Sequence, residues 1–203
     1  MRRSLFILTL MLLYIMGNSQ AHAGFEQYCY TAGSVSTIVP RVYYQSPHNW
    51  YGEVRYNYEE LQTVSLNAGK MFSHKKLVSY SITPFAGIVL GRLNGGTIGS
   101  NINIEHKSLF FSSESQYTFS VEKRRENFFF NWSELGYQLT NLVYVGLALQ
   151  LTRHYQVINE WQPGIMMGFT YKSWTFPVYA FNPAWCNRNF VVGVNWEWKY
   201  VKS

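Results

Sequence analysis

Apolar and polar side chains alternate along much of this chain with a period of two residues. In VYVGLALQLTRH, residues 143–154, the odd positions carry valine or leucine as far as Leu151, whereas most even positions carry small or polar residues. Successive side chains of a β-strand point to opposite faces, so this period predicts a strand. The alternation recurs in WYGEVRYNYE, LVSYSITPFAGIVL and FVVGVNWEWKYV. The repetition indicates an all-β protein.

The composition indicates that these strands cross a membrane. Charged residues are few at 14% and aromatic residues many at 18%, a combination that is rare in soluble secreted domains. After the N-terminal segment, no apolar run reaches the length of about 20 residues that a spanning helix needs. Backbone groups in lipid must be paired internally, and only helices and closed barrels achieve this. The sequence therefore predicts an antiparallel transmembrane β-barrel.

The number of strands follows from the alternating segments and the turns between them. Bacterial barrels have an even number of strands, short periplasmic turns and longer external loops. The turns at 46–49, 73–76, 138–141 and 172–173 are short, and those at 92–96, 121–127, 155–160 and 182–189 are longer. Placing the short turns in the periplasm requires one more strand before residue 37, and residues 25–31 provide it. We expect twelve strands, with ten, or eight with long external hairpins, as alternatives. Besides residues 25–31, the eleven other predicted strands lie near 37–46, 50–60, 62–72, 77–91, 97–106, 109–121, 128–138, 142–154, 161–171, 174–181 and 190–201.

The N-terminus has the features of a secretory signal peptide. Arg2 and Arg3 precede an apolar stretch from residue 5 to residue 16, and Ala21-His22-Ala23 provides the small-x-small cleavage pattern before Gly24. The apolar stretch is short for a transmembrane helix. We therefore expect a signal peptide over residues 1–23 and a barrel domain over residues 24–203.

The charged faces of the strands should line the lumen, because a Lys or Arg that faces lipid near the midplane costs about 2–4 kcal/mol. Their mixed signs suggest ion pairs across the lumen. Such a network can fill the barrel or leave a narrow polar passage, since twelve strands enclose more space than the eight-strand size that side chains just fill. The residues expected in the lumen are Glu53, Arg55, Glu59, Glu105, Glu114, Gln150, Lys172, Glu197 and Lys199.

The two cysteines lie in segments that barrel closure makes neighbours. Cys29 is on the predicted first strand, and Cys186 is in the loop before the last strand. The oxidising periplasm permits a disulfide. A bond between Cys29 and Cys186 is therefore a hypothesis, with two unrelated thiols as the alternative.

The chain resembles small outer-membrane β-barrel proteins of Gram-negative bacteria. The segments RYNYEEL, NFFFNWSELGYQ, LALQLTRHYQ, GIMMGFTYK and YAFNP are similar to a set of uncharacterised barrels. The resemblance implies the fold and a location in the outer membrane, and it implies no activity.

A catalytic role for His154 is a weaker hypothesis. Lipid A deacylase barrels carry a His-x-Ser element at a strand end, and here Gln156 stands at the position of the serine. Ser133, or Thr152 two residues before the histidine, would have to act as the nucleophile, and Glu160 would orient the histidine ring, as a triad requires. A histidine at the polar end of a strand needs no catalytic role.

Three classes of function follow from these observations. The first is a structural barrel or a narrow, porin-like passive pore with a polar, charge-paired lumen that passes small solutes. The second is an enzyme that modifies lipid or lipopolysaccharide with His154 as base, and the third is a barrel that binds partners through its outer loops, notably the basic run Lys123, Arg124 and Arg125. We expect lipid and lipopolysaccharide to surround the barrel. We expect no cofactor and no metal site, because the histidines are scattered singly, and no nucleic-acid partner, because no basic stripe is interleaved with aromatic residues.

The first testable prediction concerns export. Protein purified from the membrane fraction should begin at Gly24, because signal peptidase removes residues 1–23. N-terminal sequencing checks this, and a protein that begins at Met1 would contradict it.

Overall fold

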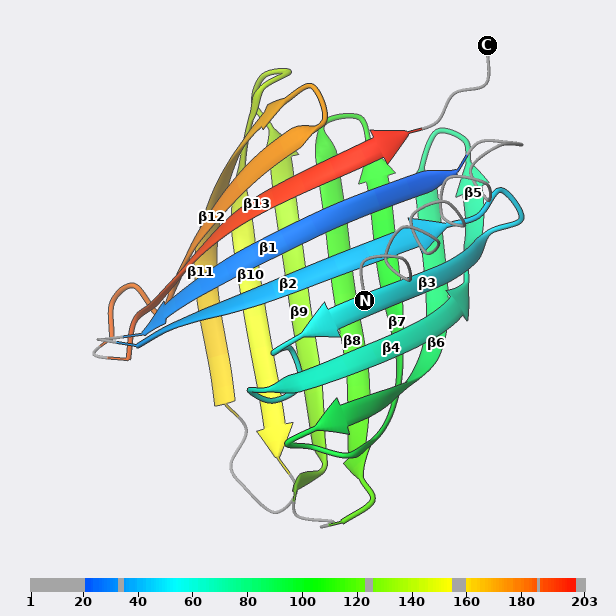
Figure 1. Cartoon of the computed structure of the whole chain (residues 1–203). Coiled ribbons are helices and arrows are strands. Elements are labelled where there is room, and N and C mark those ends of the chain that lie inside the picture. Colours follow the sequence, from blue (N-terminus) through cyan, green and yellow to red (C-terminus); the bar gives the residue numbers. More distant parts are fainter. Residues whose placement is uncertain (1–20, 33–34, 123–125, 155–159, 186, 200–203) are drawn as a thin grey trace, which may run out of the picture.

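The strands close into one antiparallel barrel with twelve strand positions (Figure 1). The computed structural model describes residues 21–32, 35–122, 126–154, 160–185 and 187–199. The strands are β1 (His22–Ala32), β2 (Val35–Gln45), β3 (Trp50–Tyr56), β4 (Thr63–Lys70), β5 (Phe72–Lys75), β6 (Ser79–Gly91), β7 (Gly95–His106), β8 (Leu109–Ser120), β9 (Phe128–Gln138), β10 (Val143–His154), β11 (Glu160–Tyr171), β12 (Trp174–Phe181) and β13 (Asn189–Lys199). Because β4 and β5 both pair with β6, they share one position, and the prediction of twelve strands is confirmed.

Closure depends on two pairings that join distant parts of the chain. Strand β1 pairs with β13 from His22 opposite Lys199 to Thr31 opposite Phe190, and it pairs with β2 on its other side. Strand β4 pairs with β6 and β3. Every strand position therefore has two neighbours, and residues 25–31 lie in the first strand as the turn pattern predicted.

Several strand boundaries differ from the sequence prediction. The strand predicted at 50–60 ends at Tyr56, and the first strand begins at His22, within the predicted signal peptide. The predicted strand 62–72 is interrupted at Met71, so the segment predicted as a turn at 73–76 largely belongs to β5. Strand β7 begins at Gly95, inside the predicted loop 92–96. A Cβ atom on Gly95 would lie only 1.9 Å from the carbonyl oxygen of Phe119, so close packing against β8 requires glycine there. Gly95 and Gly96 are thus part of the sheet and not of a loop.

The connections at one end of the barrel are short. They are residues 46–49, 76–78, 107–108, 139–142 and 172–173, and this end also holds the start of β1 and the end of β13. Lys107 and Lys172 have φ angles of 53° and 54°, the left-handed conformation that tight hairpin turns require. The predicted loops at 121–127, 155–160 and 182–189 lie at the other end, and each contains residues outside the described part of the chain.

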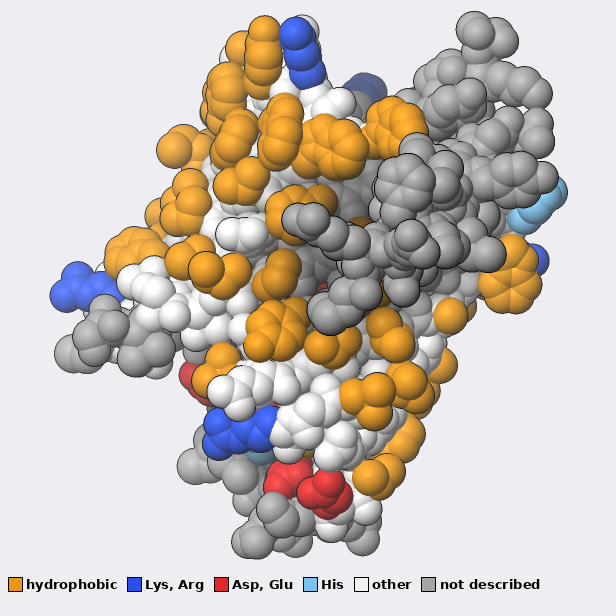
Figure 2. Space-filling model, in the orientation of Figure 1, with side chains coloured by type: hydrophobic (Ala, Val, Ile, Leu, Met, Phe, Trp, Pro, Cys, Tyr) orange, Lys and Arg blue, Asp and Glu red, His pale blue; other side chains and the backbone are white. Residues whose placement is uncertain are grey.

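The outer surface is apolar, whereas the interior combines charged and polar side chains with buried aromatic and aliphatic clusters. Exposed large side chains recur on alternate positions of the strands, such as Val42, Val54, Leu66, Leu147 and Ile165, and Figure 2 shows apolar side chains spread over one face of the wall, with the charged ones near its margins. Among the described residues, no helix has the length and apolar character needed to span a bilayer. This distribution is that of a barrel surrounded by lipid.

The apolar outer surface leads to a stability prediction. Leu147 lies near the middle of β10 with 60% of its surface exposed, so Leu147→Arg should lower the free energy of unfolding in lipid vesicles by about 2–4 kcal/mol. Leu139 is equally exposed, at 55%, but lies in the turn between β9 and β10, so Leu139→Arg should have little effect. Urea unfolding of the two variants checks this, and equal losses would show that Leu147 does not lie within the apolar zone of the bilayer.

Candidate functional site in the lumen

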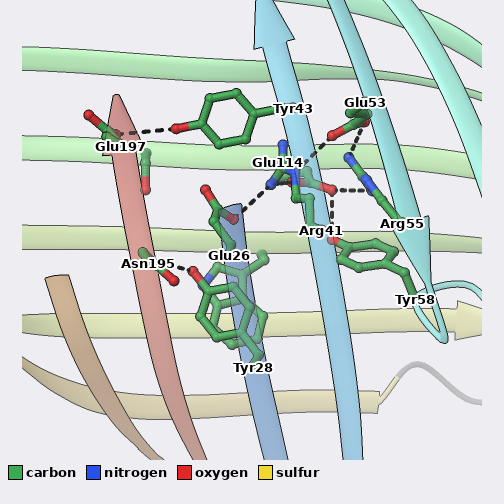
Figure 3. Close-up of polar contacts among 12 residues, drawn as sticks. Glu26, Tyr28, Arg41, Tyr43, Glu53, Arg55, Tyr58, Glu114, Asn195 and Glu197 are labelled. Carbon is green, nitrogen blue, oxygen red and sulfur yellow. Dashed lines mark hydrogen bonds and ion pairs between the residues drawn. The ribbon is translucent and has the colours of Figure 1, made fainter. Parts of the chain in front are cut away.

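Two arginines and three glutamates form a continuous ion-pair network inside the barrel (Figure 3). Arg41 on β2 lies 2.8 Å from Glu53, 3.1 Å from Glu114 and 3.4 Å from Glu26. Arg55 on β3 lies 2.6 Å from both Glu53 and Glu114. Each arginine is thus shared between carboxylates, and each of Glu53 and Glu114 is shared between arginines.

The network crosses the lumen. Glu114 is on β8, and the shorter path around the barrel from β2 to β8 passes β3, β4, β6 and β7. In Figure 1 the front strands run obliquely across the back wall that contains β8. The contacts of Glu114 with Arg41 and Arg55 therefore join opposite walls, and Figure 3 shows these side chains converging between the strands.

Neutral side chains complete the hydrogen bonding of the network. The Tyr51 hydroxyl donates to Glu53 at 2.7 Å and accepts from Arg41 at 2.8 Å, and the Tyr58 hydroxyl donates to Glu114 at 2.6 Å. Arg55 also donates to Gln116 at 2.9 Å. The side chains of Glu53 and Arg55 are fully buried, and removing one partner of a buried ion pair costs about 3–5 kcal/mol, because the other charge is left unpaired. The network should therefore hold the two walls firmly together.

An aromatic cluster around Trp132 also crosses the lumen. Trp132 on β9 contacts Tyr28 on β1 and Tyr179 and Phe181 on β12, with ring centroids 5.0 to 6.2 Å apart. The Trp132 Nε1 and the Tyr179 hydroxyl both donate to Glu134, at 2.7 and 2.8 Å. Asn195 on β13 donates to the Tyr28 hydroxyl at 3.1 Å. The carboxylate of Glu134 thus has hydrogen-bond donors, and the structure shows no ion pair to it among the described residues.

The interior is acidic although the whole chain has a formal charge of +6. The buried or half-buried charged side chains of the interior are Glu26, Glu53, Glu59, Glu114 and Glu134 against Arg41 and Arg55. Every other Lys or Arg side chain that the structure describes is exposed. Positive charge is therefore at the surface and rims, and net negative charge is in the lumen.

Glu59 is distinct because it is buried in the connection between β3 and β4 and lies outside the strands. Only 9% of its surface is exposed, and neither carboxyl oxygen has a partner with good hydrogen-bond geometry among the described residues. Burial raises the pKa of the Glu59 carboxyl above its ordinary value, and the Arg55 guanidinium opposes part of that rise. The protonated form is thus favoured more in the folded protein than in the unfolded chain.

The structure separates the residues that the sequence assigned to the lumen. Glu53, Arg55 and Glu114 belong to the network and Glu59 is buried in the connection between β3 and β4, whereas Gln150 is half-buried on β10 opposite Trp132. Glu105 and Glu197 share the inward face of their strands but are exposed, and Glu197 accepts a hydrogen bond from Tyr43 at 3.3 Å. For Lys172 the prediction is wrong: it lies exposed in the turn between β11 and β12, with its ammonium 5.3 Å from the centre of the Tyr171 ring. The side chain of Lys199 lies outside the described part of the structure.

Glu26, Arg41 and Glu134 are central to the lumen and were not predicted. Glu26 and Arg41 lie in predicted strands to which no inward face was assigned, although the even positions Glu26, Tyr28 and Tyr30 share one face. Glu134 follows Ser133, and because both are polar the alternation alone did not show which of the two side chains faces the lumen. In the structure Glu134 points inward, where it accepts hydrogen bonds from Trp132 and Tyr179. Ser133 therefore points outward.

The proposed catalytic residues do not come together. His154 is exposed opposite Phe128, with the two rings 5.7 Å apart, whereas Ser133 lies opposite Leu149 on the outer face. Five residues along a strand are about 17 Å, so the serine and the histidine are far apart as well as on opposite faces. Glu160 accepts a hydrogen bond from Gln162 at 2.5 Å. The triad suggested by the sequence is not formed.

The remaining candidate features are only partly within the described structure. Cys29 is a free cysteine on β1, and Cys186 lies outside the described residues, so the structure does not show the predicted disulfide. The basic run Lys123, Arg124 and Arg125 also lies outside them. In the described part of the chain, no three His, Cys, Asp or Glu side chains form a group that could hold a metal ion.

Comparisons with known proteins support the fold. No family model matches the chain, and no curated protein matches its sequence. Two solved structures are similar over 85% of this chain and 98% of their own: the KdgM porin, with a TM-score of 0.61 and 12% identity, and the KdgM porin in complex with disordered oligogalacturonate, with a TM-score of 0.62 and 11% identity. OccAB4 of Acinetobacter baumannii matches 86% of this chain with 57% of its own length, at a TM-score of 0.50 and 9% identity. These neighbours are outer-membrane barrels, so the predicted fold and the resemblance to Gram-negative outer-membrane barrels are confirmed at the level of the fold.

The buried carboxyl of Glu59 predicts a dependence of stability on pH. Its folded-state pKa is raised, so its stabilising contribution is complete below the unfolded-state pKa of about 4.3 and is lost as pH rises through the folded-state value. Glu59→Gln keeps the side chain neutral. It should therefore match the wild type near pH 4 and exceed it in free energy of unfolding near pH 8. Glu60→Gln, at the exposed neighbouring position, is the control and should change neither value. A Glu59→Gln variant that is no more stable at pH 8 than the wild type would show that the carboxyl is solvated.

Proposed function

We propose that the protein is a narrow passive pore of the Gram-negative outer membrane with a preference for small cations. The observation that carries the proposal is the charge of the interior, where five buried or half-buried glutamates outnumber two arginines. A low-dielectric wall around net negative charge attracts cations and repels anions. The likeness of the fold to solved porin structures supports a role in passive passage.

The cross-lumen network accounts for the narrowness of the proposed pore. Its five charged side chains extend into the lumen from β1, β2, β3 and β8, where an open channel would contain water. All five are polar, and Glu26, Arg41 and Glu114 keep part of their surface accessible, so the network restricts passage without forming an apolar seal. We therefore expect a small conductance.

The lumen differs in charge from what an acidic oligosaccharide would require. One similar porin was solved in complex with oligogalacturonate, a ligand that carries carboxylates. In this chain a ligand of that kind would meet Glu26, Glu114 and Glu134, with Arg41 and Arg55 already paired. Small neutral or cationic solutes fit this interior better.

Planar-bilayer recordings test the proposal. Wild-type protein should give small, discrete currents, and its reversal potential in a potassium chloride gradient should indicate a preference for potassium. Glu114→Gln removes one negative charge and the ion pairs that join β8 to Arg41 and Arg55. The conductance should therefore rise and the cation preference should fall. Glu60→Gln, which removes a charge from an exposed loop position, is the matched control and should leave both unchanged.

The recordings also distinguish the alternatives. Absence of current from both the wild type and Glu114→Gln, with the folded band retained on an unheated gel, would indicate a sealed barrel with a structural role. A preference for chloride would contradict the charge argument directly.

A further inference from the structure

The outer wall carries a polar cluster where a lipid-facing surface is otherwise apolar. Ser113 and Ser115 on β8 and Asn131 and Ser133 on β9 alternate with the inward-facing Glu114, Trp132 and Glu134. They therefore project from the outside of the barrel. Ser100 on β7 lies directly opposite Ser115 in the sheet and adds a third strand to this group. We call these five residues the outer polar cluster.

The outer polar cluster lies at the middle height of the wall. Strand β8 runs from residue 109 to 120, β9 from 128 to 138 and β7 from 95 to 106, so all five residues are near the centres of their strands. The middle of a spanning strand lies in the hydrocarbon core of the bilayer. In contrast, exposed positions on other strands of the wall carry Val42, Val54, Leu66 and Ile165.

The outer polar cluster satisfies only part of its own hydrogen bonding. The Asn131 side-chain nitrogen donates to Ser113 at 3.0 Å and to Ser115 at 2.9 Å, and its oxygen accepts from Ser133 at 2.9 Å. Ser113 and Ser133 are 2.9 Å apart. Within the described residues, the Ser115 hydroxyl only accepts, and no hydrogen bond of the Ser100 side chain is formed. Polar groups without partners in hydrocarbon are costly, so lipid is an unfavourable covering for this surface.

An apolar groove adjoins the outer polar cluster at Ser133. It has a volume of about 280 Å³, and the outward side chains that line it include Phe111, Leu135, Leu147 and Pro163. The wall of β7 to β11 thus combines a flat surface of small polar side chains with a depression bordered by large apolar ones.

We propose that this wall is the interface between two copies of the chain. Serine and asparagine both donate and accept hydrogen bonds, so the outer polar cluster is complementary to itself, as a two-fold interface requires. Small side chains allow close approach of two backbones within a membrane. A second copy supplies acceptors for Ser100 and Ser115. The apolar side chains at the border of its groove enter the groove of the first copy. This inference does not depend on whether the barrel conducts.

Cysteine cross-linking tests the interface. In a Cys29→Ser, Cys186→Ser background, Ser115→Cys introduces a single thiol in the outer polar cluster, and Val54→Cys introduces one at an exposed position on β3, away from the β7 to β11 wall. After oxidation with iodine in native membranes, Ser115→Cys should give a band of twice the monomer mass, and Val54→Cys should not. Equal cross-linking of the two variants, no cross-linking of either, or a Ser115→Cys product of another mass would overturn the assignment of a second copy.

The mass of the particle in native-membrane nanodiscs gives a second readout. Wild-type protein should be dimeric, and Ser115→Leu with Asn131→Leu should raise the dimer dissociation constant about tenfold or more, because interface hydrogen bonds are removed. A wild-type particle with one chain and bound lipid would mean that lipid covers this wall, and it would overturn the proposal. If the double-leucine variant fails to fold, the cross-linking comparison still decides.

Discussion

The pairing of β1 with β13 is the interaction on which the rest of the molecule depends. It joins the first and last strands over ten residue pairs and leaves no open edge in the sheet. In hydrocarbon an open edge would expose a row of backbone donors and acceptors without partners, which is why membrane sheets close. Once the sheet is closed, each side chain faces either lipid or the lumen, and the period of two residues assigns it to one or the other.

The interior follows from this closure. Charged faces of strands turn inward, so charged side chains are brought into a confined space where each needs a partner. Arg41 and Arg55 meet this need by sharing Glu53 and Glu114 across the lumen. The aromatic cluster around Trp132 fills a neighbouring part of the interior, with Glu134 held by three hydrogen-bond donors. The acidic excess of the lumen is what remains after this pairing.

Sequence reasoning predicted what depends on neighbouring residues and missed what depends on distant ones. Strand positions and the place of residues 25–31 could be read from alternation and turn length, which are local properties. The inclusion of Gly95 in β7 could not, because glycine has no side chain to mark a face. The alternation likewise put Glu53 and Arg55 on one face, but Glu114, the second carboxylate that binds Arg55, lies about 60 residues away along the chain, so this ion pair depends on which strands the closed barrel brings face to face. Asn131 to Glu134 include three polar residues and one tryptophan, so nothing in that segment alone could separate the outer face from the lumen.

The separation along the chain between Arg41 and Glu114, 73 residues, has a consequence for biogenesis. When only the N-terminal hairpins have formed, Arg41 and Arg55 have two carboxylates nearby, and the third arrives only with β8. The charges of these two arginines and two glutamates balance, but a partly assembled sheet that entered the bilayer would leave one guanidinium nitrogen of Arg55 without its β8 partners Glu114 and Gln116. Folding and insertion are thus coupled: the membrane becomes a favourable environment for the first three strands only after the middle of the chain has joined them, which favours late, concerted entry over strand-by-strand entry.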